Sequence, residues 1–326
     1  MRVISLLSAT TDLVCRLGMA HCLVGRSHGC DSPDIVASVP VVTAPNVDPN
    51  LPSAALDAAV REQAAGGGPV YRIDATQVET LRATVIITQS QCRICAVTAD
   101  DLRSVCALLG NARVISVQPI TLDDVFSDVR VIAEALGVPE RGTLLEAKMR
   151  AQFAAIMPIV REAQRALLPP PPPPRIAHLE WLAPMMGSGY WIAECCELAG
   201  ARMIAGSAGG SAPCIPLAEL ATADVILIAP CGFSIERSAQ ELIEIGLLED
   251  PAWQALPAVR AGRVFVADGN LYFNRSSSGV VESAEIVAEI SHDLAGLWGH
   301  HGKRWVCPAF FFFFFLACLL PPLHMN

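Results

Sequence analysis

VIITQSQCRIC, residues 85–95, is the most informative stretch of the chain, because an apolar β-branched run passes directly into a polar turn with two cysteines. CLVGRSHGCD, residues 22–31, has the same arrangement nearer the N-terminus. Short β-branched runs that end in polar, turn-prone residues are typical of buried parallel strands and their exit loops. Ligands of open α/β sheets bind outside the carboxyl ends of the strands, where such loops lie. Both stretches therefore predict a ligand site at one edge of a parallel sheet.

The second half of the chain has comparable exits after its own apolar runs. They are Glu180-Trp181, residues 230–233 and residues 268–273. Strand-like and helix-like patterns alternate in both halves, which predicts a doubly wound α/β fold. We therefore expect two α/β lobes that hold a ligand in the cleft between them.

Composition limits the classes of protein to which the chain can belong. With 326 residues, 52% of them hydrophobic, it is long enough for two domains with substantial cores. The formal net charge of −9, without a long basic run, argues against nucleic acid as a partner. The apolar run at residues 309–320 is too short for a transmembrane segment, which takes about 20 apolar residues.

The patterns also predict the domain organisation. A helix over residues 140–168, with Pro158 inside it, would span on the order of 40 Å at about 1.5 Å per residue and could bridge two lobes. Six consecutive prolines after it form a stiff spacer. The predicted parts are an N-terminal α/β lobe at 1–118, a helical connector at 119–168, the spacer at 169–174, a C-terminal α/β lobe at 175–295, and a disordered Phe-rich tail at 296–326.

The compartment is predicted from the cysteines and the N-terminus. Twelve cysteines could form disulfides in an oxidising compartment or be reduced thiols in the cytosol. The chain begins with a strand-like run at residues 3–7 rather than with the apolar core of a signal peptide. We expect reduced thiols in a cytoplasmic protein, or an exported protein if the N-terminus is incomplete.

Three phrases resemble a known family. RSHGCDSP at 26–33, QSQCRICAV at 89–97 and ADGNLYFNR at 267–275 are similar to the cobalamin-binding branch of the iron/B12 periplasmic-binding-protein family. The resemblance extends over roughly residues 2–292. It implies two Rossmann-like lobes joined by a single long backbone helix (the class III periplasmic-binding-protein fold), a corrinoid ligand, no catalysis, and an ABC transporter membrane subunit as partner. The chain departs from the family at residues 276–279, where SSSG replaces a Pro-Gly-Pro-Arg-like segment, and before Ser8, where a proline is missing.

Aromatic and polar side chains near the predicted strand ends are the candidate ligand contacts. Flat aromatic rings suit a large conjugated macrocycle, although the same rings could pack the lobes together. Asp268, Asn270, Gln89 and Gln91 could hydrogen-bond the amide-rich rim of a corrin, or could simply form turns. Ser8 and Thr10 are predicted to cap a helix. The full set of ligand-binding candidates is Ser27, His28, Gln89, Gln91, Glu180, Trp181, Trp191, Phe233, Asp268, Asn270, Tyr272 and Phe273.

Cysteines and one histidine at strand exits are candidate metal ligands. They are His28, Cys30, Cys92, Cys95 and Cys231, whose thiolate and imidazole groups suit zinc or iron. His28 could instead coordinate the cobalt of a corrinoid, and the thiols could simply be buried.

Three functions remain open at this point. The first is a non-catalytic binding protein that captures cobalamin or a related corrinoid, possibly for ABC-type uptake. The second is an intracellular metal-thiolate protein, either an enzyme or a metallochaperone. The third is an iron–siderophore binder, which would need a basic cleft.

Overall fold

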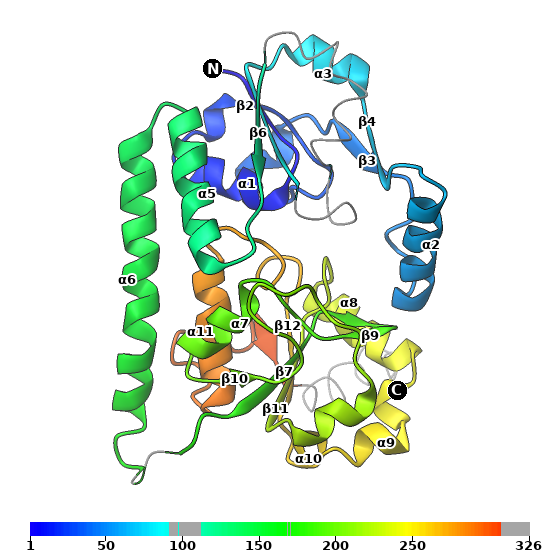
Figure 1. Ribbon diagram of the computed structural model, residues 1–326, viewed down its shortest axis with the longest axis vertical. Coiled ribbons are helices and arrows are strands. Elements are labelled where there is room, and N and C mark those ends of the chain that lie inside the picture. The colour runs from blue at the N-terminus through cyan, green and yellow to red at the C-terminus, as the bar shows by residue number, and fades with distance from the viewer. Residues whose placement is uncertain (91–96, 98–111, 168, 170, 308–326) are drawn as a thin grey trace, which may run out of the picture. The chain divides into compact units, whose positions relative to one another are not determined.

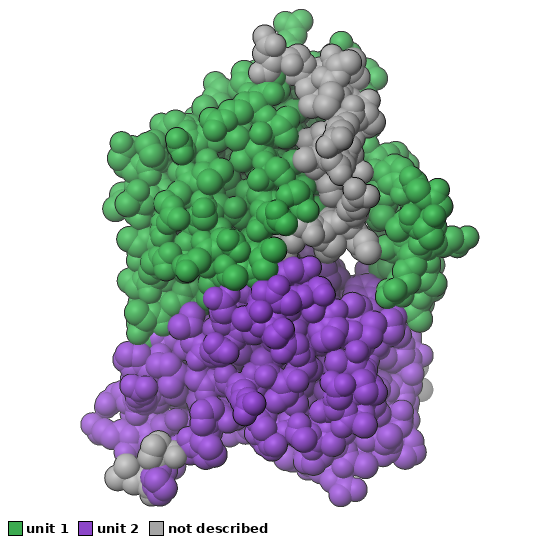
Figure 2. Space-filling model, in the orientation of Figure 1, with its two compact units in different colours: residues 1–155, 275–281 green, residues 156–274, 282–326 purple. Residues whose placement is uncertain are grey.

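The computed structural model describes residues 1–90, 97, 112–167, 169 and 171–307. The chain divides into two compact units, which Figure 2 shows in different colours. Unit 1 consists of Met1–Ala155 and Arg275–Val281, and unit 2 of Ile156–Asn274 and the chain from Glu282 onward. Unit 1 thus includes a short segment that sequence patterns placed in the C-terminal lobe.

Unit 1 is built on a parallel sheet with the strand order β2-β1-β5-β6. The strands are β1 (Val3–Ser5), β2 (Leu23–Arg26), β5 (Val85–Gln89) and β6 (Arg113–Val117). All residues of β1 and β5 are buried, as their apolar runs predict for central strands with both faces covered. Because the strands are parallel, the chain after β2 and the end of β5 lie at the same edge of the sheet.

Among the described residues, four helices and a two-stranded ribbon accompany this sheet in the part of unit 1 before the long helix. The helices are α1 (Ser8–Arg16), α2 (Ser53–Ala65), α3 (Ala75–Leu81) and α5 (Leu122–Ala135), and the antiparallel ribbon pairs β3 (Thr43–Pro45) with β4 (Tyr71–Ile73). Short 3-10 turns cover Ala20–Cys22 and Asp34–Ser38. Figure 1 shows α2 on the connection between the two ribbon strands. The predicted helix at 98–109 lies outside the described residues.

The prediction that Ser8 or Thr10 caps α1 is wrong. Leu7 is the N-cap residue and provides no side-chain hydrogen bond. Ser8 is already helical, and its hydroxyl donates to the carbonyl oxygen of Gly29. The hydroxyl of Thr10 is 3.0 Å from the Leu7 carbonyl oxygen. The Ser8 hydroxyl therefore ties α1 to the loop after β2, and the Thr10 hydroxyl bonds the carbonyl of the N-cap residue instead of a backbone N–H group.

The long helix α6 (Pro139–Ala163) is one continuous element of 25 residues, and it passes from unit 1 into unit 2 along the chain (Figure 1). The prediction of two α/β units joined by one long helix, the class III periplasmic-binding-protein fold, is confirmed. Pro158 lies inside the helix without ending it. The predicted end at residue 168 is wrong, because the chain turns after Ala163 and then enters the proline run, whose residues lack backbone N–H donors.

Unit 2 has a five-stranded sheet with the order β10-β7-β11-β12-β13. The strands are β7 (Arg175–Leu179), β10 (Arg202–Met203), β11 (Val225–Ile228), β12 (Val264–Ala267) and β13 (Trp305–Val306), and a separate ribbon pairs β8 (Trp181–Leu182) with β9 (Met185–Met186). The first four sheet strands are parallel, whereas β13 is antiparallel to β12. The exits of β7, β11 and β12 therefore meet at one edge.

Helices cover this second sheet. They are α7 (Ile192–Leu198), α8 (Ile235–Glu244), α9 (Pro251–Gln254), α10 (Pro257–Arg260) and α11 (Val280–Ser291), with 3-10 turns at Leu217–Thr222 and Leu247–Glu249. A buried cluster that includes Leu179, Ile226, Ile228 and Trp253 forms the core on one side of the sheet. The apolar runs predicted these strands because central strands of parallel sheets are covered on both faces.

The predicted start of the disordered tail at residue 296 is wrong. We name residues 296–307 the C-terminal segment, which contains β13 and the buried Trp305. Its indole N–H donates to Glu289 on α11 at 2.6 Å, and the backbone N–H of Trp298 donates to the other oxygen of that carboxylate at 2.7 Å. The phenylalanine run at 310–315, which lies outside the described residues, was the reason for predicting disorder from residue 296 onward.

His178 should make the stability of unit 2 depend on pH. Its imidazole on β7 is fully buried against Phe273 (ring centroids 4.9 Å apart), and burial lowers its pKa to about 3. Neither ring nitrogen has a hydrogen-bond partner within the described residues. Because the folded pKa is lowered, the unfolded chain binds the proton first, so the stabilisation is complete above pH 6.5 and declines toward pH 3.

We expect the free energy of unfolding to fall by about 2 kcal/mol between pH 6.5 and 5, at about 1.4 kcal/mol per pH unit. Denaturant unfolding curves at each pH measure this fall. His178→Phe removes this titrating group while roughly conserving volume. Over the same pH interval, the free energy of unfolding of the variant should therefore fall by about 2 kcal/mol less than that of the wild type. His21→Gln at an exposed position is the matched control and should retain the wild-type slope. Parallel curves for His178→Phe and wild type would contradict the assignment.

Candidate ligand-binding site

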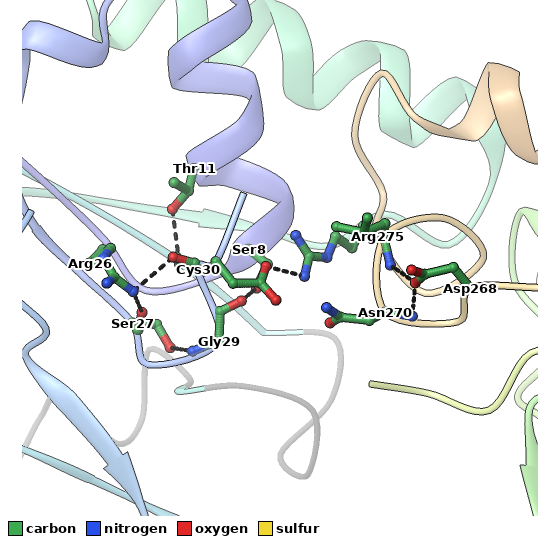
Figure 3. Close-up of polar contacts among 11 residues, drawn as sticks. Ser8, Thr11, Arg26, Ser27, Gly29, Cys30, Asp268, Asn270 and Arg275 are labelled. Carbon is green, nitrogen blue, oxygen red and sulfur yellow. Dashed lines mark hydrogen bonds and ion pairs between the residues drawn. The ribbon is translucent and has the colours of Figure 1, made fainter. Parts of the chain in front are cut away.

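The loop after β2, residues 27–31, is fixed from several sides. The Ser8 hydroxyl donates to the carbonyl oxygen of Gly29. The Arg26 guanidinium donates to the carbonyl oxygen of Cys30 at 2.8 Å, and Arg275 forms an ion pair with Asp31 at 2.6 Å (Figure 3). Since donors from three separate parts of unit 1 meet on this loop, its geometry is set before any ligand arrives.

His28 is the chemically most distinctive residue of this loop. The Thr43 hydroxyl donates to Ser27 Oγ at 3.1 Å and accepts from the His28 backbone N–H at 3.0 Å. His28 Nδ1 lies 2.8 Å from the same hydroxyl oxygen. With the hydroxyl hydrogen of Thr43 donated to Ser27, this geometry favours a proton on Nδ1, which places the lone pair of the ring on Nε2. Burial lowers the pKa of His28 from 6.5, so the ring is neutral at pH 7 and suited to bind a metal.

Tyr71 on β4 lies beside this histidine. The centroids of the two rings are 5.2 Å apart, and the ring planes are inclined by 34°. Neither Thr43 nor Tyr71 was predicted as a site residue. Both are on the ribbon β3–β4, which has no strong apolar run, and only the fold brings them to the loop after β2.

The other predicted polar contacts of unit 1 are largely enclosed. The Ser27 hydroxyl is buried and accepts from the Gly29 backbone N–H at 3.3 Å, so it supports the turn. Gln89 is the last residue of β5 and is only 3% exposed. Gln91 lies outside the described residues. His28 is therefore the predicted residue of this edge that combines partial exposure with an available lone pair.

The cysteines do not assemble into a metal site in the part of the chain that the structure describes. Cys30 is fully buried, its sulfur accepts from the Thr11 hydroxyl at 3.0 Å, and burial raises the pKa of its thiol. Cys231 is an exposed cysteine of unit 2. Cys92 and Cys95 lie outside the described residues. Among the described residues, no group of three or more His, Cys, Asp or Glu side chains has a geometry that could hold a metal ion.

In unit 2, the three predicted strand exits meet as expected from the sheet order. The backbone N–H of Cys231, after β11, donates to the Glu180 carbonyl oxygen, after β7, at 3.0 Å. The backbone N–H of Asn270, after β12, donates to the Phe233 carbonyl oxygen at 3.1 Å. One Glu180 side-chain oxygen accepts from the buried Ser188 hydroxyl at 2.9 Å. The exits are therefore joined into a single edge by backbone hydrogen bonds.

Trp181 provides an aromatic surface at this edge. Its ring is partly exposed and packs edge-on against Phe233, with centroids 5.3 Å apart. Phe233 itself is 1% exposed, and the Arg237 guanidinium lies 3.8 Å from its centroid. Phe233 thus supports the Trp181 ring rather than presenting surface of its own, and Arg237 stacks on Phe233. Arg237 was not predicted, because a charged residue in the first turn of a helix gives no sequence signal of ring stacking.

The other predicted aromatic residues differ in exposure. Phe273 and Trp191 are buried, at 1% and 6% exposure, and Phe273 packs on His178. Tyr272 is partly exposed, and the Arg304 guanidinium lies 5.0 Å from its ring centroid. Trp181 and Tyr272 are therefore the predicted aromatic residues of unit 2 with surface left for a ligand.

Asp268 and Asn270 form the turn that the alternative interpretation expected. Asp268 Oδ1 accepts from the backbone N–H groups of Asn270 at 2.9 Å and Leu271 at 2.7 Å, the first of which Figure 3 shows. Gly269 has no room for a side chain, since a Cβ would lie 2.1 Å from the Pro230 carbonyl oxygen. Both Asp268 and Asn270 are still partly exposed. The turn therefore presents the second carboxylate oxygen and an amide on a rigid backbone.

A surface hollow of about 510 Å³ lies elsewhere in unit 1. It is lined by α2 residues such as Ala59 and Gln63 together with Asn46 and Asp48. None of the predicted site residues lines it. The chemistry at the strand ends of each unit is the stronger indicator of ligand binding, with an oriented histidine in unit 1 and partly exposed aromatic rings in unit 2.

Comparison with known proteins identifies the family. Residues 76–271, more than half of the chain, match the family model described as periplasmic binding protein. The chain belongs to this family. No curated protein matches the chain.

Solved structures show the same fold at low sequence identity. The apo periplasmic heme-binding protein RhuT from Roseiflexus sp. RS-1 is 20% identical, with a TM-score of 0.64 and coverage of 90% of this chain and 98% of that chain. The periplasmic vitamin B12 binding protein BtuF of Vibrio cholerae is 18% identical, with a TM-score of 0.61 and coverage of 90% and 97%. An ABC transporter substrate-binding protein from Listeria monocytogenes is 15% identical, with a TM-score of 0.63 and coverage of 90% and 98%.

Membership in the family corrects one prediction and supports others in part. The expectation of a cytoplasmic protein is wrong, because the family and the heme- and B12-binding structures named above are periplasmic. The family is one of binding proteins rather than catalysts. Within the described ranges, no helix has the length and apolar character needed to cross a membrane.

Proposed function

We propose that this chain is a binding protein for a metal-centred tetrapyrrole, that its preferred ligand is a corrinoid of the cobalamin type, and that it delivers this ligand to an ABC-type membrane transporter. The carrying observation is the position of His28, whose Nδ1 lies 2.8 Å from the Thr43 hydroxyl, because this contact favours the tautomer with the Nε2 lone pair free for cobalt. The second ring nitrogen of metal-binding histidines usually has such a partner. The family membership supports the role in binding and transport.

The exposed surfaces at the strand ends of unit 2 support a macrocyclic ligand. Trp181 and Tyr272 offer flat apolar area, which a conjugated ring system covers at little entropic cost. Asp268 and Asn270 add hydrogen-bonding groups on a preformed turn. Apolar contact with a few oriented polar groups is the usual composition of a small-molecule site.

Within the part of the chain that the structure describes, the arginines near the strand ends favour a ligand with neutral amides over one with carboxylates. Arg275 is paired with Asp31, and Arg26 donates to the carbonyl oxygens of Val39 and Cys30. Arg237 lies on the Phe233 ring. An anionic ligand would have to displace these contacts, whereas the amide rim of a corrin would not. The same argument disfavours anionic iron–siderophore complexes.

Haem is the second candidate, and Tyr71 is the observation that favours it. A tyrosine and a histidine whose rings lie 5.2 Å apart are both known types of haem-iron ligand. Haem carries propionates, so this candidate requires some of the arginine contacts to rearrange.

Titration of the full-length protein with hydroxocobalamin, cyanocobalamin and haemin, followed by calorimetry and visible absorbance, distinguishes the candidates. We expect both cobalamins to bind with micromolar or lower Kd. An absorbance shift should occur only with hydroxocobalamin, whose axial oxygen ligand exchanges with an imidazole. Haemin binding more tightly than either cobalamin would favour the second candidate. Absence of binding for all three would reject the proposed function.

Thr43→Val should weaken binding of hydroxocobalamin about 10-fold, in the range typical for loss of the hydrogen-bond partner of a metal-binding histidine. Valine keeps the shape of threonine but removes the hydroxyl that fixes the His28 tautomer. Thr80→Val, which removes an exposed hydroxyl on α3, is the control and should bind as the wild type does. Equal affinities of the two variants would show that the tautomer of His28 does not matter for binding.

A further inference from the structure

The C-terminal segment connects α11 to the loop after β12. On one side it contacts three acidic residues of α11. Glu289 accepts two hydrogen bonds from the segment, Glu285 lies 2.9 Å from His300 Nε2, and Glu282 lies 3.8 Å from an Arg304 guanidinium nitrogen. The spacing of three and four residues places these carboxylates on one face of the helix. The segment is thus held along the length of α11.

The other side of the segment contacts the turn that carries Asp268 and Tyr272. β13 pairs with β12, with Trp305 opposite Ala267. The Arg304 carbonyl oxygen accepts from the Asp268 backbone N–H at 3.0 Å, at the first residue of the turn. The Arg304 guanidinium lies 5.0 Å from the Tyr272 ring centroid, near Glu282. Arg304 therefore contacts the turn through its backbone and the ring through its side chain.

The remaining sides of this turn are already closed within unit 2. Asn274 donates to the Gly269 carbonyl oxygen at 2.8 Å, and the Gly269 backbone N–H donates to the Phe233 carbonyl oxygen at 3.0 Å. The Tyr272 ring is partly exposed and lies beside the Arg304 guanidinium. A cation near an aromatic face attracts the ring and restricts its orientation.

We propose that the C-terminal segment is a positioning element of the binding site and that Arg304 is the residue that orients Tyr272 for ligand contact. Arg304 acts through Tyr272 and Asp268 and does not itself touch the ligand. The inference deepens the proposed function and rests on it for the affinity measurement. It assigns a role in binding to the C-terminal segment, which follows α11.

Arg304→Gln in the full-length protein tests the inference. The variant retains the backbone hydrogen bond to Asp268 but loses the positive charge beside Tyr272 and Glu282. We expect Kd for hydroxocobalamin to rise about 10-fold, as for other groups that orient a contact residue. Hydrogen exchange of residues 268–272 in the ligand-free protein should accelerate about 10-fold, because the turn opens more readily. Arg304→Lys keeps the charge and should restore both values to within about threefold of wild type.

Lys303→Gln is the matched control, because it removes one positive charge from the neighbouring exposed position. It should leave both measurements unchanged. Thermal unfolding of each ligand-free variant separates positioning from general destabilisation, since a structural role alone would lower the midpoint without a local change in exchange. Wild-type affinity and exchange in Arg304→Gln would overturn the inference. If the wild type binds no tetrapyrrole, the proposed function fails, and the exchange of residues 268–272 alone decides whether Arg304 positions the turn.

Discussion

Truncation after Gly296 is expected to destabilise unit 2 by about 5 kcal/mol, which corresponds to a fall of roughly 15 °C in its unfolding midpoint. Trp305 is 2% exposed, and loss of a buried tryptophan side chain costs about 3 kcal/mol. Glu289 is fully buried and would lose the Trp298 and Trp305 donors, at about 2 kcal/mol for a charged group left without its hydrogen bonds. The two costs arise together, because the same segment provides both.

Differential scanning calorimetry of two truncated chains checks this result. A chain ending at Cys307 keeps all contacts of the C-terminal segment with α11 and β12, so its midpoint should lie roughly 15 °C above that of the chain ending at Gly296. Glu289→Ala in the full-length chain should reproduce only part of the loss, since Trp305 can remain packed on Phe265. Equal midpoints for chains ending at 296 and 307 would show that the segment does not stabilise the unit.

His28→Ala is expected to lower the affinity for hydroxocobalamin on the order of 100-fold, equivalent to about 2.7 kcal/mol of binding free energy. The absorbance change on binding should disappear, because the nitrogen that replaces the axial ligand is gone. Affinity for cyanocobalamin should change by less than about threefold, since cyanide keeps its axial position. Calorimetry and absorbance titrations at pH 7 measure both effects.

Two control variants and a pH series test whether His28 is the residue that coordinates the metal. Tyr71→Phe keeps the ring beside His28 but removes the hydroxyl, so it should retain the spectral change unless the tyrosine is the metal ligand. His21→Ala removes an exposed histidine and should have no effect. Because burial lowers the pKa of His28, the wild-type affinity should hold as the pH falls to 6.5 and weaken only below that value. A spectral change that persists in His28→Ala would exclude this residue as the ligand.

Local patterns predicted most of the fold but only part of the candidate site. The apolar runs before Gln89 and Glu180 gave the central strands, because burial on both faces demands continuous hydrophobic sequence. Thr43 and Tyr71 could not be found in the same way. They lie on a short ribbon, and their relation to His28 depends on a contact across 15 residues or more of chain.

The candidate aromatic residues show a second limit of sequence patterns. Phe233 and Phe273 follow strand ends just as Trp181 and Tyr272 do, yet the first two are buried and the latter two keep exposed surface. A strand-end position fixes the edge of the sheet but not the side to which each ring turns. The C-terminal segment was missed for a related reason, since Trp305 and Val306 lie close to a run of unusual composition that obscured their pairing with β12.

The return of residues 275–281 to unit 1 has a consequence for synthesis of the chain. Asp31 and its partner Arg275 are separated by 244 positions, and Ser278 donates to Asp12 across 266. When Ala155 leaves the ribosome, about 120 residues must still be made before Arg275 is available, which takes roughly 6–24 s at 5–20 residues per second. During that interval the N-terminal unit lacks its last segment, so the loop that carries His28 reaches its final form only after nearly the whole second sheet has been translated.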